Sequence, residues 1–477
     1  MVSPRKISGA LLAAVLACGA LAACTAAAAP EPTLTWQPCA DNAALECATL
    51  PVPIDWDDPA GERVGIAVIR DRADDPATRV GTLVSLPGGP GTSGVDQISR
   101  GAPFSATLRA RFDIVSLDPR GVGRSNPVRC DAGLATGRPG LVPEAGGLLT
   151  EVHSYARDLA ASCREHTGPL LDHLDAESVA RDVEALRIAL GEQQFSLYSR
   201  SYGTMPAQRY AELFPSRLRA SLLDSVDDHS LDGAEFLATE ARAGEDTFAE
   251  FAAWCARDRA CVLHGTEVAA TYRALFAAAT RGELRAPTGA ALAPIDLSTK
   301  VTQRLYRPEW AELAKDLQAL AAHPRGPAES PAPPRRTGVI APFPPIIFCS
   351  DWRFDIADQE RWSRLWQEQR ANAPTLGAHF AWGAASLCSG WPVAPQNPPH
   401  RPQITGGPPI LILNSRHDPA TPHEWALQVA AQTPHATLLS YEGWGHGIYD
   451  RTPCTIAAAD RYLLELQVPL GPSCPAA

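Results

Sequence analysis

The 477-residue sequence predicts an α/β fold, in which a mostly parallel central sheet is flanked by helices and carries an inserted, mainly helical cap. Three observations predict it. Short apolar runs typical of buried strands recur through residues 36–230, with a stretch of helical spacing among them. Residues 231–403 change to Ala-rich helical patterns. Further apolar runs in residues 404–477 restore the sheet, so the helical interval is a cap inserted above the strand ends.

The N-terminal residues 1–23 have the pattern of an export signal. Two basic residues precede an apolar stretch that is too short to span a bilayer comfortably. The order Leu-Ala-Ala-Cys that ends at Cys24 resembles the bacterial lipobox, in which the cysteine is lipidated and becomes the new N-terminus. Cleavage among residues 26–29 is the alternative. Both alternatives predict an extracytoplasmic protein, either a lipoprotein at the cell surface or a secreted one, with residues 24–35 as a tether.

Charge and cysteine content narrow the protein class. The formal net charge of −11 argues against nucleic acid or an anionic membrane as the main partner. The only membrane contact that we expect is the lipid anchor at the N-terminus. Twelve cysteines less Cys18 and Cys24 leave ten, which indicates a disulfide framework in an exported chain. No close cysteine pair lies beside a histidine pair, so no metal site is predicted. The oligomeric state stays open. Connectivity is not fixed by sequence, and nearest-neighbour pairing is the prediction: Cys39 with Cys47, Cys130 with Cys163, Cys255 with Cys261, Cys349 with Cys388, and Cys454 with Cys474.

The strand and helix patterns follow one another along the chain. The first two strands would form an antiparallel edge of the sheet. The predicted strands lie at residues 50–56, 64–70, 80–86, 112–117, 195–198, 219–224, 409–414 and 437–441. The predicted helices lie at residues 175–190, 235–255, 310–322 and 460–467, and the cap also has an exposed Pro-rich loop at 324–345.

Residues 195–210 combine a short apolar run, a cluster of small residues and a helix-forming segment, which predicts a strand, a sharp turn and a helix. A serine at the tip of such a turn holds its hydroxyl above the sheet, over the helix N-terminus. Ser201 is therefore the predicted nucleophile, with the small residue Gly203 two positions later. Ser199 stands where the Gly-x-Ser-x-Gly pattern has its first glycine. An ordinary strand-loop-helix connection is the alternative.

A glycine-rich loop at residues 87–94 directly follows the strand pattern at 80–86. Such glycine density lets backbone N–H groups point into a cavity. We assign an oxyanion hole to the N–H groups of Gly89 and of Tyr202, the residue after the nucleophile. A phosphate-binding loop is the rival interpretation, but the Lys-Ser/Thr ending of a P-loop and the Gly-x-Gly-x-x-Gly order are both absent.

A nucleophilic serine needs a base, and the base needs a carboxylate to fix its tautomer. Asp418 and His446 each follow a late strand pattern, which gives the chain order Ser, Asp, His expected of an α/β-hydrolase. His446, flanked by glycines, is the predicted general base and later the general acid. Asp224 is the rival acid, because some hydrolases take the acid from the strand just after the nucleophile.

These motifs resemble the proline iminopeptidase and tripeptidyl aminopeptidase branch of the α/β-hydrolases over most of residues 36–474. The loop at 88–91 is similar to that branch's His-Gly-Gly-Pro-Gly loop, with Pro87 in place of the histidine, whose role is not carried over. The segments 347–351 and 388–392 are similar to the C-terminal segment of secreted actinobacterial tripeptidyl aminopeptidases, which supports the disulfide between them. The resemblance implies release of short N-terminal peptides through an acyl-enzyme, with no metal or cofactor.

The predicted function is thus that of an exported serine aminopeptidase acting on peptides. An exopeptidase must hold the free ammonium of its substrate, and a carboxylate in the cap is the physical means. Asp351, Asp355 and Glu360 are the candidates, with a solvated surface as the alternative for each. A carboxylesterase or lipase acting on small esters with the same triad is the nearest other function. A surface lipoprotein that binds a ligand without catalysis is a further alternative.

Overall fold

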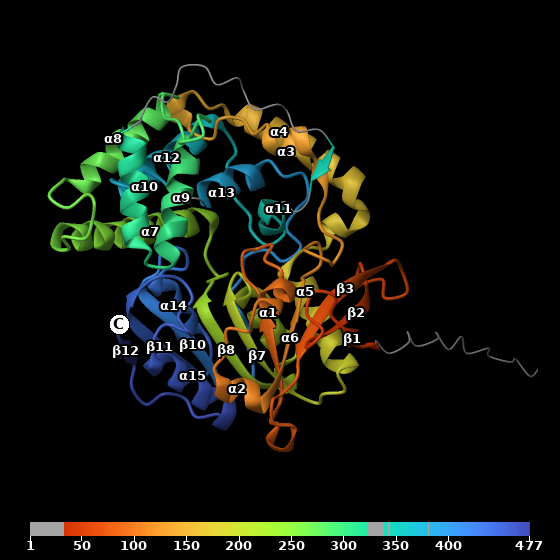
Figure 1. The fold of residues 1–477 in the computed structure, drawn as a ribbon. Coiled ribbons are helices and arrows are strands. Elements are labelled where there is room, and N and C mark those ends of the chain that lie inside the picture. The colour runs from red at the N-terminus through yellow and green to blue at the C-terminus, as the bar shows by residue number, and fades with distance from the viewer. Residues whose placement is uncertain (1–32, 323–337, 341–343, 380) are drawn as a thin grey trace, which may run out of the picture. The chain divides into compact units, whose positions relative to one another are not determined.

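Figure 1 shows the fold in the computed structural model, which describes residues 33–322, 338–340, 344–379 and 381–477. The export signal with Cys24, most of the tether and most of the Pro-rich loop lie outside the described residues. Within the described part of the chain, every helix is too short or too polar to cross a membrane.

Ten strands of the described chain form one sheet, in the order β1-β2-β3-β5-β4-β7-β8-β10-β11-β12. β1 pairs with β2, β2 with β3 and β3 with β5, all antiparallel, and every other pair in this sheet is parallel. This confirms the predicted α/β fold with its antiparallel edge. A separate short pair joins β6 to β9. The strands are β1 Gln37–Pro38, β2 Glu46–Pro53, β3 Arg63–Asp71, β4 Gly81–Leu86, β5 Phe112–Leu117, β6 Cys130–Asp131, β7 Phe195–Ser201, β8 Leu218–Val226, β9 Val339–Ile340, β10 Ile410–His417, β11 Ala436–Trp444 and β12 Ser473–Pro475.

Helices cover both faces of the sheet because successive side chains of a strand point to opposite faces. Leu222 of β8 enters the apolar layer under α1, α2 and α15, whereas Leu223 enters the layer under α5, α6 and α14. A sheet buried on both faces explains the continuous apolar runs of its inner strands. The covering helices are α1 Gly94–Ser99, α2 Ala106–Arg111, α5 Ala176–Ala189, α6 Thr204–Leu213, α14 His423–Gln432 and α15 Pro453–Glu465.

The cap helices lie between two strands that pair directly. Leu223 of β8 is the register partner of Ile412 of β10, although the chain between them forms seven helices of the described structure. Figure 1 shows these helices over one end of the sheet. They are α7 Gly233–Arg257, α8 Val268–Thr280, α9 Pro294–Tyr306, α10 Trp310–Ala322, α11 Pro344–Phe348, α12 Gln359–Asn372 and α13 Ala381–Ser389.

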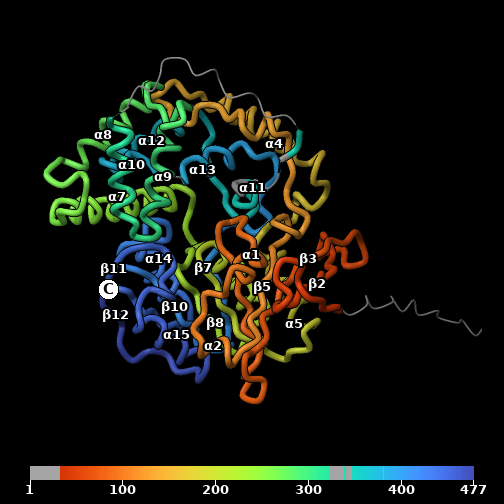
Figure 2. The backbone as a smooth tube through the Cα atoms, viewed as in Figure 1, coloured from red at the N-terminus to blue at the C-terminus, as the bar shows by residue number. Residues whose placement is uncertain are grey.

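A second segment also belongs to the cap. Helices α3 (Ala132–Thr136) and α4 (Leu149–Thr167) come from the stretch 36–230 that sequence reasoning assigned to the core. Helix α4 packs against α12 and α13 instead of against the sheet, as the trace in Figure 2 also shows. The pairing of β6 with β9 joins the same two parts of the chain. The cap is therefore built from two separate stretches of sequence.

Five disulfide bonds join the ten cysteines in the predicted nearest-neighbour order. Their sequence separations run from 6 to 39 residues. Cys39–Cys47 and Cys454–Cys474 lie at the two ends of the large sheet, and the other three lie in the cap. Each disulfide thus links residues of one part of the fold, and none joins the cap to the sheet.

A buried ion pair between Arg120 and Asp182 joins the turn after β5 to α5. Their side chains are 0% and 1% exposed, two guanidinium nitrogens lie 2.8 and 2.6 Å from the carboxylate, and Trp56 donates to it at 3.1 Å. Because Asp182→Ala leaves a buried unpaired charge, we expect a loss of about 3–5 kcal/mol in the free energy of unfolding, measured with urea. The control is Asp96→Ala, which breaks an exposed pair with Arg124 and should cost about 1 kcal/mol or less. Equal losses would contradict the prediction.

Candidate active site

Ser201 ends β7 at the turn that leads into α6. Its backbone has a φ of +56°, in the left-handed region where a non-glycine residue is strained. The turn is tight: a Cβ on Gly203 would lie 2.6 Å from the Pro87 carbonyl oxygen, and one on Gly88 would lie 2.8 Å from Ser201 Cβ. The Thr204 hydroxyl donates to the Ser201 carbonyl at 2.7 Å. The predicted strand, sharp turn and helix are all present, with the serine at the tip.

The histidine and the aspartate are in direct contact. With its proton on Nδ1, His446 donates to both carboxylate oxygens of Asp418 at 3.0 Å. Both side chains are buried, and Nε2 of His446 remains as the free basic nitrogen of the ring. This arrangement can fix the tautomer that a general base requires.

Hydrogen bonds from neighbouring groups hold the Asp418 carboxylate. It accepts from the Ser225 hydroxyl at 2.8 Å, from the Thr421 hydroxyl at 3.0 Å and from the backbone N–H groups of Ala420 and Thr421 at 2.9 and 3.0 Å. Burial acts to raise the pKa of Asp418, but His446 and these donors outweigh it, so the pKa lies below its usual value. Asp418 is therefore ionised at neutral pH. Sequence reasoning did not single out Ser225 or Thr421.

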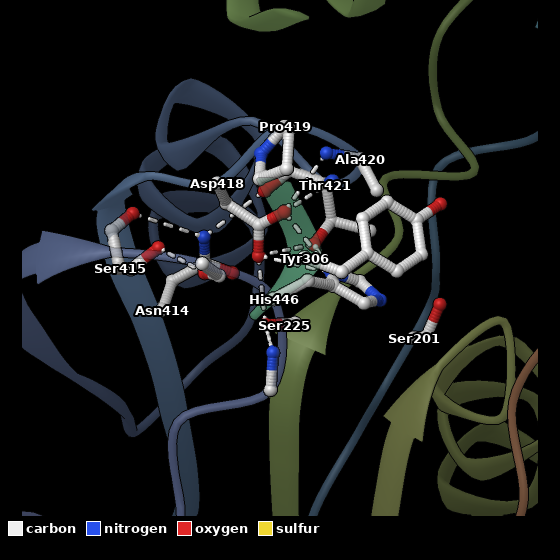
Figure 3. A network of polar contacts seen from close by, with 12 residues as sticks. Ser201, Ser225, Tyr306, Asn414, Ser415, Asp418, Pro419, Ala420, Thr421 and His446 are labelled. Atoms are coloured by element: carbon white, nitrogen blue, oxygen red, sulfur yellow. Dashed lines mark hydrogen bonds and ion pairs between the residues drawn. The ribbon is translucent and has the colours of Figure 1, made fainter. Parts of the chain in front are cut away.

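Figure 3 shows the His446 ring between Asp418 and Ser201, with the serine hydroxyl on the far side of the ring. No hydrogen bond joins the Ser201 hydroxyl to the other residues drawn in Figure 3, and such contacts are often loose before substrate binds. The structure thus brings the three predicted residues to one site from β7 and from the loops after β10 and β11.

The rival acid Asp224 has a different set of partners. It accepts hydrogen bonds from the backbone N–H groups of Ile448 and Tyr449 at 2.7 and 3.1 Å and from the Tyr198 hydroxyl at 2.8 Å. It therefore holds the loop that follows His446 and does not bond to the imidazole.

Ser201 opens into a cavity of about 300 Å³ with mostly apolar walls. Gly89 and Tyr202 line the same cavity. Neither backbone N–H group donates to another residue that the structure describes, so both are left for a ligand. These are the two donors that the sequence assigns to an oxyanion hole.

The structure corrects the prediction for the substrate ammonium. Asp351 is buried away from the cavity, and its carboxylate is fully occupied by the Ala176 N–H at 2.9 Å, the Asn397 amide at 2.8 Å and the Tyr202 hydroxyl. Burial, then the neighbouring Asp175, raises the pKa of Asp351 to about 7. Asp355 and Glu360 have side chains that are 82% and 81% exposed and pair with surface arginines. None of the three faces the cavity.

Two other carboxylates line the cavity, and sequence reasoning missed both. Asp227 follows β8 directly, and Glu240 lies on the cap helix α7. Asp227 is 8% exposed, and its carboxylate has no hydrogen-bond or ion-pair partner among the described residues. Burial, and then the charges of Glu240 and Asp418, raise the pKa of Asp227 well above its usual range. The only sequence signal for Asp227 as a cavity residue was its position just after the carboxyl end of a predicted parallel strand.

Glu240 differs from Asp227 in contacting a histidine side chain. Its carboxylate contacts Nδ1 of His379, and Nε2 of His379 lies 2.7 Å from the carbonyl oxygen of Pro419, next to Asp418. Burial raises the pKa of Glu240, and His379 offsets part of this rise. The cap helix α7 is thereby connected to the loop that carries the acid.

Comparison with known proteins gives consistent matches. Residues 373–474 match a family model described as TAP-like protein. Carboxylesterase B of Mycobacterium tuberculosis is 32% identical, over 92% of this chain and 89% of its own length. The tripeptidyl aminopeptidase of Streptomyces coelicolor is 30% identical, over 93% and 86%. The serine protease Hip1 of Mycobacterium tuberculosis is 28% identical, over 87% and 85%.

The carboxylesterase and the aminopeptidase each match more than nine-tenths of the chain, which is more than the sheet or the cap contains alone. The names of the three relatives include an esterase, an aminopeptidase and a protease, which share acyl transfer to water as their chemistry. Similarity at this level over nine-tenths of the sequence, with a parallel sheet and a serine at a strained turn, establishes that the chain is a serine hydrolase of the TAP-like family of α/β-hydrolases.

Proposed function

We propose that this serine hydrolase is an aminopeptidase that releases short N-terminal peptides, with Ser201 as nucleophile, His446 as base and Asp418 as the orienting acid. His446 Nε2 takes the hydroxyl proton as Ser201 Oγ attacks the scissile carbonyl carbon. The proton then passes to the leaving amine, which departs as the acyl-enzyme forms. Water, deprotonated by the same histidine, releases the N-terminal peptide and restores the serine.

The oxyanion of each tetrahedral intermediate would be held by the backbone N–H groups of Gly89 and Tyr202. Both groups lack another acceptor in the described structure, so accepting the oxyanion breaks no existing hydrogen bond. Donors of this kind contribute about 3–4 kcal/mol each to the transition state. The buried bond between the Tyr202 hydroxyl and Asp351 supports this role, because it fixes the residue that carries one donor.

One observation favours an aminopeptidase over an esterase. The carboxylate of Asp227 lies on the wall of the cavity that contains Ser201 and has no partner among the described residues. Because burial raises the pKa of Asp227, its charged form is disfavoured in the free enzyme, and a cation placed beside it would stabilise that form. The free α-ammonium of a peptide is such a cation. Ordinary ester substrates have no positive charge to place there. Glu240, a second acid on the same wall, would add to the attraction for a cation when it is ionised.

The backbone of Asp227 is tied to the nucleophile turn. Its N–H donates to the Thr204 hydroxyl at 2.9 Å, and that hydroxyl donates to the Ser201 carbonyl. The Gln208 amide donates to the Asp227 carbonyl at 2.9 Å. An ammonium held by Asp227 would therefore have a set position relative to the serine, which is how an exopeptidase measures from the N-terminus of its substrate.

The aminopeptidase proposal is tested with the variant Asp227→Asn, assayed on a tripeptide arylamide and on the same arylamide with an acetylated N-terminus. Wild-type enzyme is expected to cleave the free-amine substrate much faster, and the variant should lose about 100-fold in kcat/KM on that substrate only. Asp228→Asn is the matched control, because its carboxylate accepts from Ser230 and is not on the cavity. Equal wild-type rates on the two substrates would rule out an aminopeptidase and favour the esterase.

We also propose that the enzyme acts outside the cytoplasm. Its five disulfide bonds are typical of exported proteins. The signal pattern at residues 1–23 supports the same location, with Cys24 as the lipid-bearing residue of a surface lipoprotein or, in the alternative, with cleavage to a secreted enzyme. The intact mass of the exported protein distinguishes a lipidated Cys24 from an unmodified N-terminus.

A further inference from the structure

Tyr306, the last residue of the cap helix α9, is packed on the histidine of the site. Its ring centroid lies 4.8 Å from that of His446, with the ring planes tilted by 43° (Figure 3). Its carbonyl oxygen accepts from the His446 N–H at 2.8 Å and from Arg451 at 2.7 Å. A Cβ on Gly445 would lie 2.7 Å from the same oxygen, so this approach requires a glycine there. The end of a cap helix is thus fixed to the loop that carries the base.

The hydroxyl of Tyr306 is left for a ligand. Tyr306 lines the cavity that contains Ser201, and Figure 3 shows its hydroxyl on the side of the His446 ring where Ser201 lies. This hydroxyl has no hydrogen-bond partner among the described residues, although the ring and the backbone carbonyl are both held. A polar group that faces a mostly apolar cavity without a partner gains from a ligand that supplies one.

The chemistry of the hydroxyl limits what it can bind. Burial, and then the charges of Glu240 and Asp418, raise the pKa of Tyr306 well above its usual value, so the phenol stays protonated. Asp227 and Glu240 on the same wall can only accept hydrogen bonds when ionised, or bind a cation. A neutral phenol donates a hydrogen bond whatever the charge of these two acids. The acceptors that a bound peptide offers are its carbonyl oxygens.

We propose that the Tyr306 hydroxyl donates a hydrogen bond to a peptide carbonyl of the substrate next to the scissile bond, so that the cap supplies a substrate-binding group to a site whose reacting groups lie on the core. The inference rests on the proposed roles of Ser201 and His446. Because the Tyr306 ring contacts the imidazole, a substrate that reaches His446 Nε2 must pass beside the phenol. The scissile carbonyl itself belongs to the oxyanion hole, so Tyr306 binds one of the other carbonyls of the peptide.

The experiment compares two substrates that release the same group, p-nitrophenyl acetate and a tripeptide p-nitrophenyl ester with a free amine. The acetate has only the scissile carbonyl, whereas the tripeptide ester has two more. Tyr306→Phe removes the hydroxyl and keeps the ring on His446 and the backbone carbonyl. We expect kcat/KM to fall about tenfold on the tripeptide ester and less than about twofold on the acetate.

Tyr155→Phe is the matched control. Tyr155 also lines the cavity, but its hydroxyl is enclosed in the protein and has no partner among the described residues, so a substrate does not reach it. The ratio of the two rates should stay at the wild-type value in this variant. An equal fall on both substrates in Tyr306→Phe would mean that the phenol acts on His446, and no fall on either would mean that it has no role. Both outcomes overturn the proposal.

The test of Tyr306 and the test of the aminopeptidase activity can fail independently of each other. The preference of the wild type for a free amine decides the proposed function, whereas the effect of Tyr306→Phe on the tripeptide ester relative to the acetate decides the role of the phenol. An esterase without amine preference would still show the Tyr306 effect if the hydroxyl binds a carbonyl, and an aminopeptidase without the Tyr306 effect would retain its preference for the free amine.

Discussion

Ser201→Ala is expected to lower kcat by about 10⁴–10⁶-fold, because the proposed acyl-enzyme forms on the Ser201 hydroxyl. The same change should abolish labelling by a fluorophosphonate, which reacts with an activated serine. The folded state should persist, since no hydrogen bond joins the Ser201 hydroxyl to the other residues drawn in Figure 3 and its removal leaves none of these unpaired. Peptide-arylamide kinetics, labelling and thermal unfolding of the same preparation measure the three effects.

Ser199→Ala is the matched control for this experiment. Ser199 lies two residues earlier on β7, is fully buried, and donates to the Leu222 carbonyl at 3.3 Å. It should lose some stability but keep its labelling. Labelling that survived in Ser201→Ala would assign the nucleophile to another residue, and a wild-type protein that took no label would favour a ligand-binding lipoprotein without catalysis.

Asp418→Asn is expected to lower kcat by about 10⁴-fold at neutral pH. An amide does not stabilise the imidazolium, and it favours the tautomer with the proton on Nε2, which is the wrong one for a base. The packing changes little, because the amide keeps the size of the carboxylate. Four donors now directed at Asp418, from Ser225, Ala420 and Thr421, would however compete for a single amide oxygen.

Asp224→Asn tests the rival assignment. Its carboxylate holds the backbone of Ile448 and Tyr449, so this variant should lose stability and show a much smaller fall in kcat. Steady-state kinetics of both variants at several pH values decide between them. If Asp224→Asn lost activity by orders of magnitude while Asp418→Asn did not, the acid of the site would have to be reassigned.

Local signals in the sequence were enough for the longer strands of the sheet and for the residues that follow them, whereas the short edge strands β1 and β12 were not predicted. Apolar runs of strand length predicted the inner strands, and the turn at Ser201 was recognisable from the small residues around it. Asp418 and His446 could be paired from chain order alone, because parallel strands place their carboxyl ends on the same edge. The signal is strong there since each feature depends on a few neighbouring residues.

Most of the residues that line the cavity could not be predicted from the sequence. Asp227, Glu240 and Tyr306 come from three different elements, and only the packing of the cap on the sheet brings them together. Asp351 shows the opposite error, because an acid in the cap segment proved to be an internal hydrogen-bond acceptor. Helix α4 was not predicted as a helix, and it fell within the stretch 36–230 assigned to the core, because only the fold shows that it packs on the cap.

The short span of every disulfide has a consequence for how this protein matures. In the export that we propose, with the N-terminus emerging first, each of the ten paired cysteines would meet its partner after at most 39 further residues. Each link can therefore close in turn while downstream chain is still inside the cell. Oxidation in order of emergence gives the correct set of bonds, with little opportunity for wrong partners and little need for later reshuffling.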